Sequence, residues 1–152
     1  MPSPTTAHRE RLTVPLRWWV QATMLLATFL LAFVVAMPLA PALIITGLMA
    51  AACAALFLVW GSARVEVADG ELRAGGARIP LSHVGEPLPL DKDETRRVHG
   101  VDADARAFLV MRPYLKRSVQ VPVTDAADPT PYWLVSSRNP RRLAAAIADH
   151  RG

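Results

Sequence analysis

Hydrophobic and charged positions divide this chain of 152 residues into unequal parts. Residues 18–63 contain no Asp, Glu, Lys or Arg, whereas four charged residues precede this stretch and 26 follow it. About 20 apolar residues cover a hydrocarbon core of roughly 30 Å, so the stretch is long enough for two spans. Pro38 and Pro41 interrupt it near the middle, and proline disfavours a continuous helix. We therefore predict two transmembrane helices, at residues 18–37 and 42–61, joined by a tight turn.

The flanking residues predict the orientation of this transmembrane hairpin (residues 18–61). Four arginines flank the charge-free stretch, and the turn has none: Arg9, Arg11, Arg17 and Arg64. The positive-inside rule then places both termini in the cytoplasm. Three tryptophans occupy the same ends of the spans, where interfacial aromatic residues collect: Trp18, Trp19 and Trp60. The expected localisation is the cell membrane, with residues 1–17 as a cytoplasmic segment and residues 1–8 disordered.

A cleaved signal peptide is the alternative interpretation of the first span. Ala40-Pro41-Ala42 resembles a cleavage site. The apolar run is longer than the usual 7–15 residues of a signal core, and a second apolar span would still follow it. The pattern favours the two-span hairpin.

Residues 64–152 change to short alternating segments separated by turn residues, which is typical of β-strands. Asp69-Gly70 and Gly75-Gly76 are strong turn signals. Pro87 and Pro89 place the fourth strand at a sheet edge, because proline cannot donate to a strand ladder. Seven strands are predicted, at residues 64–67, 71–74, 77–81, 86–90, 107–111, 118–124 and 132–136.

Two helices are also predicted in this cytoplasmic domain (residues 64–152). Residues 91–99 begin with acidic side chains and end with basic ones before Gly100, as the helix dipole favours. The final helix is expected to be capped by Asn139 and to start at Pro140, with Leu143 and Ile147 on one face. The predicted fold class is an α+β membrane protein: a two-helix transmembrane hairpin, then a small antiparallel β barrel or sandwich, pleckstrin-homology-like, with a C-terminal helix over one open end.

The sequence predicts no catalytic, cofactor-binding or metal-binding residue. The four histidines lack the spacing of zinc ligands, and the acidic clusters lack the pattern of a calcium loop. No nucleophile-elbow motif occurs, and Gly75-Gly76 lies between strands rather than before a helix. A single cysteine, Cys53, excludes a disulfide within the chain.

Basic residues supply the candidate interaction surface. Arg112, Lys116 and Arg117 surround Tyr114, and Arg138 precedes the last helix. The domain has 14 Lys and Arg against 12 Asp and Glu, an excess too small for a nucleic-acid binder. Near an anionic inner leaflet, each basic residue contributes about 1 kcal/mol, so membrane lipids are the expected partner.

Tyr132 and Trp133 are the other candidates, because neighbouring strand residues point to opposite faces. At least one of the two is expected in the core. Trp133 is included in the candidate surface as an exposed aromatic residue near Arg138, available to an unidentified membrane or cytoplasmic protein.

A set of segments spread over nearly the whole chain carries a resemblance to known proteins: residues 17–19, 63–73, 95–97, 107–110, 111–115, 118–121 and 128–138, with Pro140 and Leu143. The run from Asp128 to Trp133 is the most specific part. These segments resemble a family of actinobacterial integral membrane proteins of unknown function, which share two N-terminal spans and a small C-terminal domain. The domain also resembles bacterial pleckstrin-homology-like domains, which implies a binding or scaffolding role by analogy and supplies no catalytic residues.

The leading functional hypothesis is a non-enzymatic, membrane-anchored interaction module for a protein or for anionic lipid headgroups. The alternatives are a membrane-bound enzyme or an accessory subunit of a cell-envelope complex, and a purely structural stabiliser of such a complex. A polar pocket would favour an enzyme, whereas an exposed basic and aromatic patch would favour binding.

Overall fold

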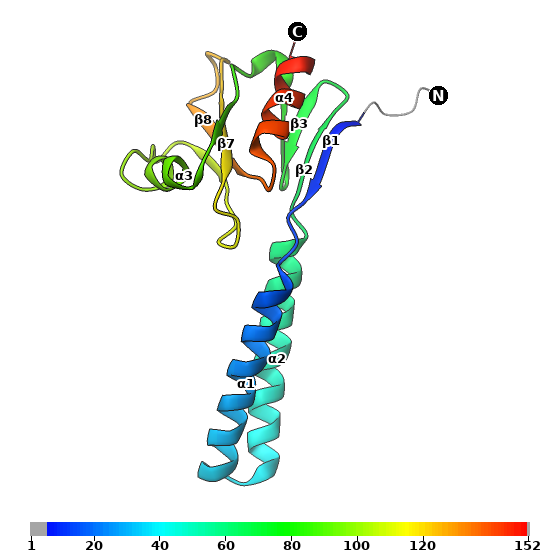
Figure 1. The fold of residues 1–152 in the computed structure, drawn as a ribbon, viewed down its shortest axis with the longest axis vertical. Helices are drawn as coiled ribbons and strands as arrows, with labels where there is room; N and C mark the ends of the chain where they lie inside the picture. Colours follow the sequence, from blue (N-terminus) through cyan, green and yellow to red (C-terminus); the bar gives the residue numbers. More distant parts are fainter. Residues whose placement is uncertain (1–5, 152) are drawn as a thin grey trace. The chain divides into compact units, whose positions relative to one another are not determined.

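The computed structural model describes residues 6–151, which form two compact units (Figure 1). The first, here called the β unit, contains the chain up to Leu12 and from Ala63 onward. The second, the helical unit, runs from Thr13 to Ser62. The β unit is therefore assembled from both sides of the helical insertion.

The helical unit consists of two helices, α1 (Leu16–Ala36) and α2 (Leu39–Gly61). The predicted break at the prolines is confirmed, but the second helix begins at Leu39 rather than residue 42. Pro41 lies in its first turn, where the missing N–H has no helical acceptor to lose. The first helix begins two residues before the predicted start, directly after Pro15.

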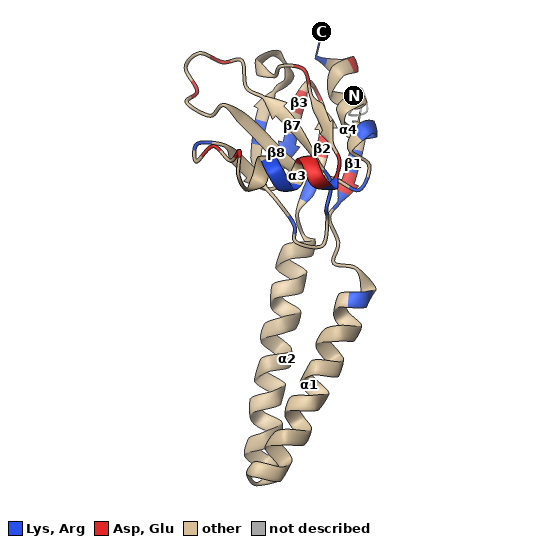
Figure 2. Cartoon of the chain, turned by 60° about the vertical axis from the view of Figure 1, so that its left-hand side comes forward, with Lys and Arg blue, Asp and Glu red and all other residues tan. Residues whose placement is uncertain are grey.

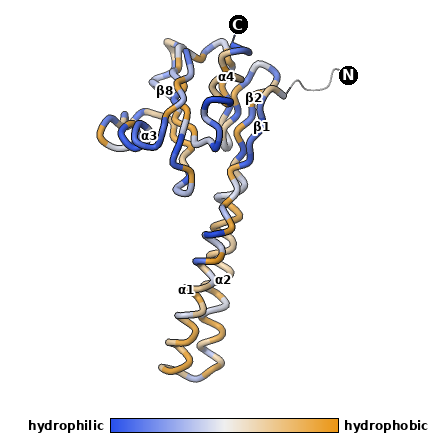
Figure 3. Tube along the Cα trace, viewed as in Figure 1, coloured by the Kyte–Doolittle hydropathy of each residue, from blue (hydrophilic) through white to orange (hydrophobic). Residues whose placement is uncertain are grey.

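Both helices are long and apolar enough to cross a membrane. Their 21 and 23 residues correspond to about 31 and 34 Å of helix. Within the two helices, a charged residue occurs only near the start of α1, and hydrophobic residues predominate in both (Figures 2 and 3). The Trp19 and Phe57 rings meet edge to face at 5.0 Å, which brings the start of α1 beside the end of α2. Most of their large apolar side chains remain exposed, a surface suited to an apolar environment.

The largest correction concerns the N-terminal segment. Residues 6–8 were predicted to be disordered and the segment to lie outside the cytoplasmic domain, but Thr6–Arg11 forms strand β1. This strand pairs antiparallel with β2 (Arg64–Ala68), with a register irregularity between Thr6 and His8. Residues 1–5 of the predicted disordered stretch lie outside the described residues. The polar composition of β1 gave no local signal, because its pairing partner lies more than 50 residues away.

The first sheet has the order β1-β2-β3-β4 and is antiparallel throughout. Strands β3 (Glu71–Ala74) and β4 (Ala77–Pro80) follow the two predicted turns. Asp69 and Gly70 have φ values of 52° and 73°, the left-handed pair that a tight hairpin turn requires. The strands predicted at residues 64–67, 71–74 and 77–81 are thus confirmed within one residue.

The second sheet has the order β5-β7-β8-β6. Its strands are β5 (Leu88–Leu90), β6 (Phe108–Val110), β7 (Ser118–Pro122) and β8 (Tyr132–Ser136). The prediction that β5 lies at an edge is confirmed. The prediction of an entirely antiparallel domain is wrong, since β6 and β8 are parallel. Strand β8 lies between β6 and β7, parallel to β6 and antiparallel to β7.

Two α-helices complete the β unit, α3 (Lys92–His99) and α4 (Pro140–His150), with a short 3-10 helix at Leu81–His83. Asp91 caps α3 and forms a reciprocal capping box with Glu94. Helix α4 begins at Pro140 as predicted, but the expected side-chain cap from Asn139 is absent. Instead, the Asn139 backbone N–H donates to Ser137 Oγ, and its carbonyl accepts from Leu143 N.

The hydrophobic core lies where α4 meets strands of both sheets. Leu143 and Ile147 of α4 are fully buried in the same cluster as Val65 and Leu72 of the first sheet and Val119 of the second. At one corner, Val84 pairs with Val123 and Gly85 N donates to the Pro122 carbonyl. These contacts join two four-stranded sheets and a C-terminal helix into one unit.

Candidate functional site

The β unit has one end at which β1 and β2 continue into the helical unit, and we call it the linker end. There, Arg11 pairs with Arg64, and Leu12 N donates to the Ala63 carbonyl. The turn at Gly75-Gly76 lies at the same end of the first sheet, and Gly75 approaches Val110, which leads into residues 111–117. The segments 11–12, 63–64, 74–77 and 111–117 contain no acidic residue and five basic ones: Arg11, Arg64, Arg112, Lys116 and Arg117. The start of α3 adjoins the same end, because Leu90 pairs with Ser118, and it adds three carboxylates: Asp91, Asp93 and Glu94.

The opposite end of the sheets is the more acidic one, although both charge colours occur at each end (Figure 2). Three of its segments, 68–71, 80–84 and 123–131, contain no Lys or Arg, and residues 102–107, which lead into β6 at the same end, contain Arg106 paired with Asp104. The three segments contain four acidic residues: Asp69, Glu71, Asp125 and Asp128. The ends of the sheets are therefore electrostatically unequal, with positive charge where the chain enters the helical unit.

Tyr114 organises the loop at the linker end. Its hydroxyl donates to the Leu12 carbonyl at 2.5 Å, and its side chain is only 4% exposed. Tyr114 was predicted as part of an exposed interaction surface, and this is wrong because the ring is buried. Burial raises the pKa of the Tyr114 phenol, while the charges of Arg112 and Arg138 partly oppose this shift. The ring fastens the basic loop to the last residue of the β unit before the linker.

Replacing Tyr114 with phenylalanine is expected to lower the free energy of unfolding by about 1–2 kcal/mol, because the buried Leu12 carbonyl loses its donor. The raised pKa adds a pH dependence. Above pH about 10 the unfolded tyrosine ionises before the folded one, so wild-type stability falls as pH rises through the folded pKa. Denaturant unfolding of both proteins between pH 8 and 11 checks this. The prediction is contradicted if the free energy of unfolding changes with pH equally in the wild type and in Tyr114→Phe above pH about 10.

The four predicted basic residues lie around this anchored loop. Lys116 and Arg117 are exposed, and Arg112 is partly buried, with its backbone N–H donating to Ser136 Oγ. Arg138 is exposed and adjoins the same region, because Ser137 N donates to the Arg117 carbonyl. The structure thus brings the predicted basic cluster together, around a tyrosine that is not itself on the surface.

Trp133 does not belong to this cluster. It is 6% exposed and packs against Phe108 with ring centroids 4.6 Å apart. Its place in the predicted interaction surface is a further error, because this face of β8 turns into the core. Its neighbour Tyr132 is only partly buried, and its hydroxyl accepts a hydrogen bond from Asp104 N at 3.2 Å.

Glu10 is a structural residue that the sequence did not indicate. Its carboxylate accepts hydrogen bonds from Ser137 Oγ and Arg138 N, both at 2.6 Å, and its side chain is 10% exposed. His8 Nε2 lies 3.5 Å from the same carboxylate. These contacts connect β1 to the segment between β8 and α4.

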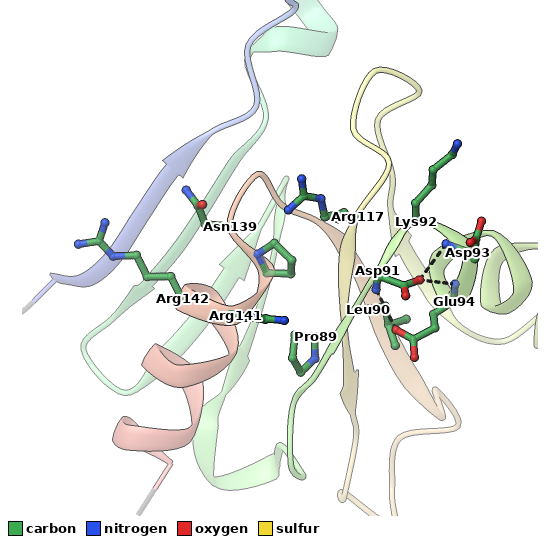
Figure 4. Close-up of a pocket in the computed structure, with 11 residues that line it drawn as sticks. Pro89, Leu90, Asp91, Lys92, Asp93, Glu94, Arg117, Asn139, Arg141 and Arg142 are labelled. Atoms are coloured by element: carbon green, nitrogen blue, oxygen red, sulfur yellow. Dashed lines mark hydrogen bonds between the residues drawn. The ribbon is translucent and has the colours of Figure 1, made fainter.

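A cavity of about 750 Å³ lies between the starts of α3 and α4 (Figure 4). Arg141 extends toward Pro89 and Arg117 lies farther up in the view, whereas Arg142 points away. The lining carries four basic residues and three acidic ones, so its charge selects neither cations nor anions: Lys92, Arg117, Arg141, Arg142, Asp91, Asp93 and Glu94. Its size lies within the range of small-molecule sites. Among residues 6–151, no group of three or more His, Cys, Asp or Glu side chains is arranged to hold a metal ion.

Comparison with known proteins identifies a family without a described activity. No curated protein and no solved structure matches this chain. A family model described as "Protein of unknown function (DUF3093)" matches residues 7–147. This match includes β1, both apolar helices and the β unit through most of α4. The chain therefore belongs to the DUF3093 family of proteins of unknown function.

Proposed function

We propose that this protein is a non-enzymatic membrane-anchored interaction module whose linker end contacts anionic lipid headgroups. In this proposal α1 and α2 span the membrane as a hairpin, and both termini and the β unit are cytoplasmic. The observation that carries the proposal is the division of charge along the β unit. Residues 11–12, 63–64, 74–77 and 111–117 carry five basic residues and no acidic one, and the carboxylates that adjoin this end are those at the start of α3. Residues 68–71, 80–84 and 123–131 at the other end carry four acidic residues and no Lys or Arg, and Arg106 beside them is paired with Asp104.

The length of the connections supports this assignment. Only residues 13–15 separate Leu12 from α1, and only Ser62 separates α2 from Ala63. A chain extends at most about 3.6 Å per residue, so Leu12 stays within about 14 Å of Leu16. If the helices span a bilayer, the linker end is held near its headgroups, and Tyr114 keeps the basic loop beside Leu12.

The expected energetic effect is large enough to orient the β unit. Arg112, Lys116 and Arg117 together contribute about 3 kcal/mol near an anionic surface, at about 1 kcal/mol each. The contribution falls with salt, because screening acts over about 10 Å at 0.1 M ionic strength. Orientation by these residues therefore requires anionic lipid and low to moderate salt.

Spin labels on the full chain in nanodiscs test the proposal. Cys53 is replaced by alanine, and one label is attached at Pro113→Cys or at Ala126→Cys, both exposed and at opposite ends of β7. In discs with anionic lipid and a nickel-chelating headgroup, we expect collision with nickel to be several-fold more frequent at position 113. Substituting glutamine for Arg112, Lys116 and Arg117 should reduce this difference. Equal collision at both positions in the parent protein would contradict the proposal.

A further inference from the structure

A second, smaller cavity lies between α3 and the loop of residues 111–117, and we call it the basic groove. Its volume is about 180 Å³. It is lined by Lys92, Thr95, Arg96 and His99 of α3 and by Met111 and Lys116 of the loop. The α3 residues lie at spacings of three and four, so they share one helix face. This spacing is visible in the sequence, but only the fold brings Lys116 opposite it.

The charge of the basic groove is uncompensated. Three of its six lining residues are Lys or Arg, a fourth is His, and none is Asp or Glu. Within the described part of the chain, no ion pair joins Lys92, Arg96 or Lys116 to an acidic side chain. Like charges gathered in a small space repel one another, and an anion bound between them removes that repulsion. In this respect the basic groove differs from the larger cavity, where three acidic residues face the basic ones.

The acidic residues of α3 are directed elsewhere. Asp91 and Glu94 are held in the capping box at the start of the helix, where Asp91 Oδ1 accepts from Asp93 N and Glu94 N. Together with Asp93 they line the larger cavity and not the basic groove, whereas Arg96 and His99 line the groove and Lys92 lines both. Helix α3 thus separates its charges by position, with cations toward the loop at the linker end.

The remaining lining is apolar or already bonded. Thr95 is buried, and its hydroxyl shares a 2.9 Å hydrogen bond with Ser118 Oγ. Met111 adds a thioether, a weakly polar group that packs against hydrocarbon. Basic side chains beside this apolar or already bonded lining suit a molecule that has both an anionic group and hydrocarbon. A space of about 180 Å³ is too small for a whole phospholipid, so only the headgroup phosphate would enter.

We propose that the basic groove binds the phosphate of an anionic membrane lipid. This inference rests on the proposed function, in which the linker end faces the headgroups. Two of the lining residues, Met111 and Lys116, belong to the loop that Tyr114 fastens to Leu12. In the orientation of the proposed function, lipid phosphates are the anions that this loop faces. Arginine and lysine bind phosphate through charge-assisted hydrogen bonds, which are the stronger class.

Lipid titration of the full chain tests the inference. The delipidated protein in detergent is titrated with dioctanoyl phosphatidic acid, dioctanoyl phosphatidylcholine and glycerol 3-phosphate, and binding is followed by calorimetry. We expect phosphatidic acid to bind at least tenfold more tightly than the other two. Arg96→Gln with Lys116→Gln should weaken phosphatidic acid binding at least tenfold. The matched control, Arg78→Gln with Arg141→Gln, removes the same charge from exposed positions outside the groove and should change affinity less than twofold.

Each other result overturns the inference. Equal affinity for glycerol 3-phosphate would identify a soluble phosphate ester as the ligand. Loss of binding in the control pair would place the site at the larger cavity, which Arg141 lines. Unchanged binding in the groove variant, with an unchanged melting temperature, would show that the groove holds no lipid phosphate. The nanodisc labels at positions 113 and 126 separate this failure from failure of the proposed function, because they report contact with headgroups and do not depend on phosphate selectivity.

Discussion

Replacing Leu143 with alanine is expected to lower the free energy of unfolding of the β unit by about 3–4 kcal/mol, within the range for a buried leucine. Leu143 is fully buried on α4, and this helix contacts β1 and β2 of the first sheet and β5 and β7 of the second. A cavity at this point removes apolar contacts that hold the two sheets together. Hydrogen exchange measured by mass spectrometry on the full chain reports the β unit separately from the helical unit. A loss of this size corresponds to at least a hundredfold faster exchange at globally protected amides.

Leu109→Ala is the matched control for this prediction. The chemical change is the same, but Leu109 lies on β6 and is 46% exposed. Its substitution should cost less than about 1 kcal/mol, because little apolar surface is lost from the core. Similar exchange rates in the two variants would show that α4 does not join the sheets energetically.

Replacing Glu10 with alanine is expected to destabilise the β unit by about 3 kcal/mol. The substitution leaves the buried Ser137 hydroxyl and the Arg138 N–H without their acceptor, and hydrogen bonds to charged groups contribute about 1.5–3 kcal/mol each. Because Glu10 connects β1 to the segment before α4, we expect faster exchange first in residues 6–11 and 137–139.

Glu66→Ala provides the control for Glu10. Glu66 lies on the neighbouring strand β2, opposite Arg9, and is partly exposed. Among the described residues, no hydrogen bond or ion pair involves the Glu66 carboxylate. We expect a change within about 0.5 kcal/mol, as for most surface substitutions. If Glu66→Ala and Glu10→Ala release β1 equally, the carboxylate contacts of Glu10 are not what holds the strand.

The candidate surface combines residues that are neighbours in the sequence with residues that only the fold brings together. Arg112, Lys116 and Arg117 were found because they are close in the sequence, and the loop keeps them close in space. Tyr114 lies among them but is buried, since its hydrogen-bond acceptor is Leu12, over 100 residues away. The sequence did not connect this loop with Lys92, Arg96 and His99, which belong to the helix that ends at His99, before the loop begins at Met111.

The sequence by itself determined the helices and turns that depend on residues close together along the chain. The charge-free stretch and its prolines specified two apolar helices, Asp69-Gly70 specified a turn, and the acidic start and basic end of residues 91–99 specified a short helix. Each of these depends on interactions within a few residues, so periodicity and turn chemistry were sufficient.

Only the tertiary structure decided the contacts between distant segments. It placed the polar segment Thr6–Arg11 in the first sheet, set β6 parallel to β8, and buried Trp133 and Tyr114. It also brought Lys116 to the cationic face of α3. The physical reason is that strand pairing and burial depend on which segment lies opposite. When that segment is dozens of residues away, the order of polar and apolar residues in a strand does not reveal it.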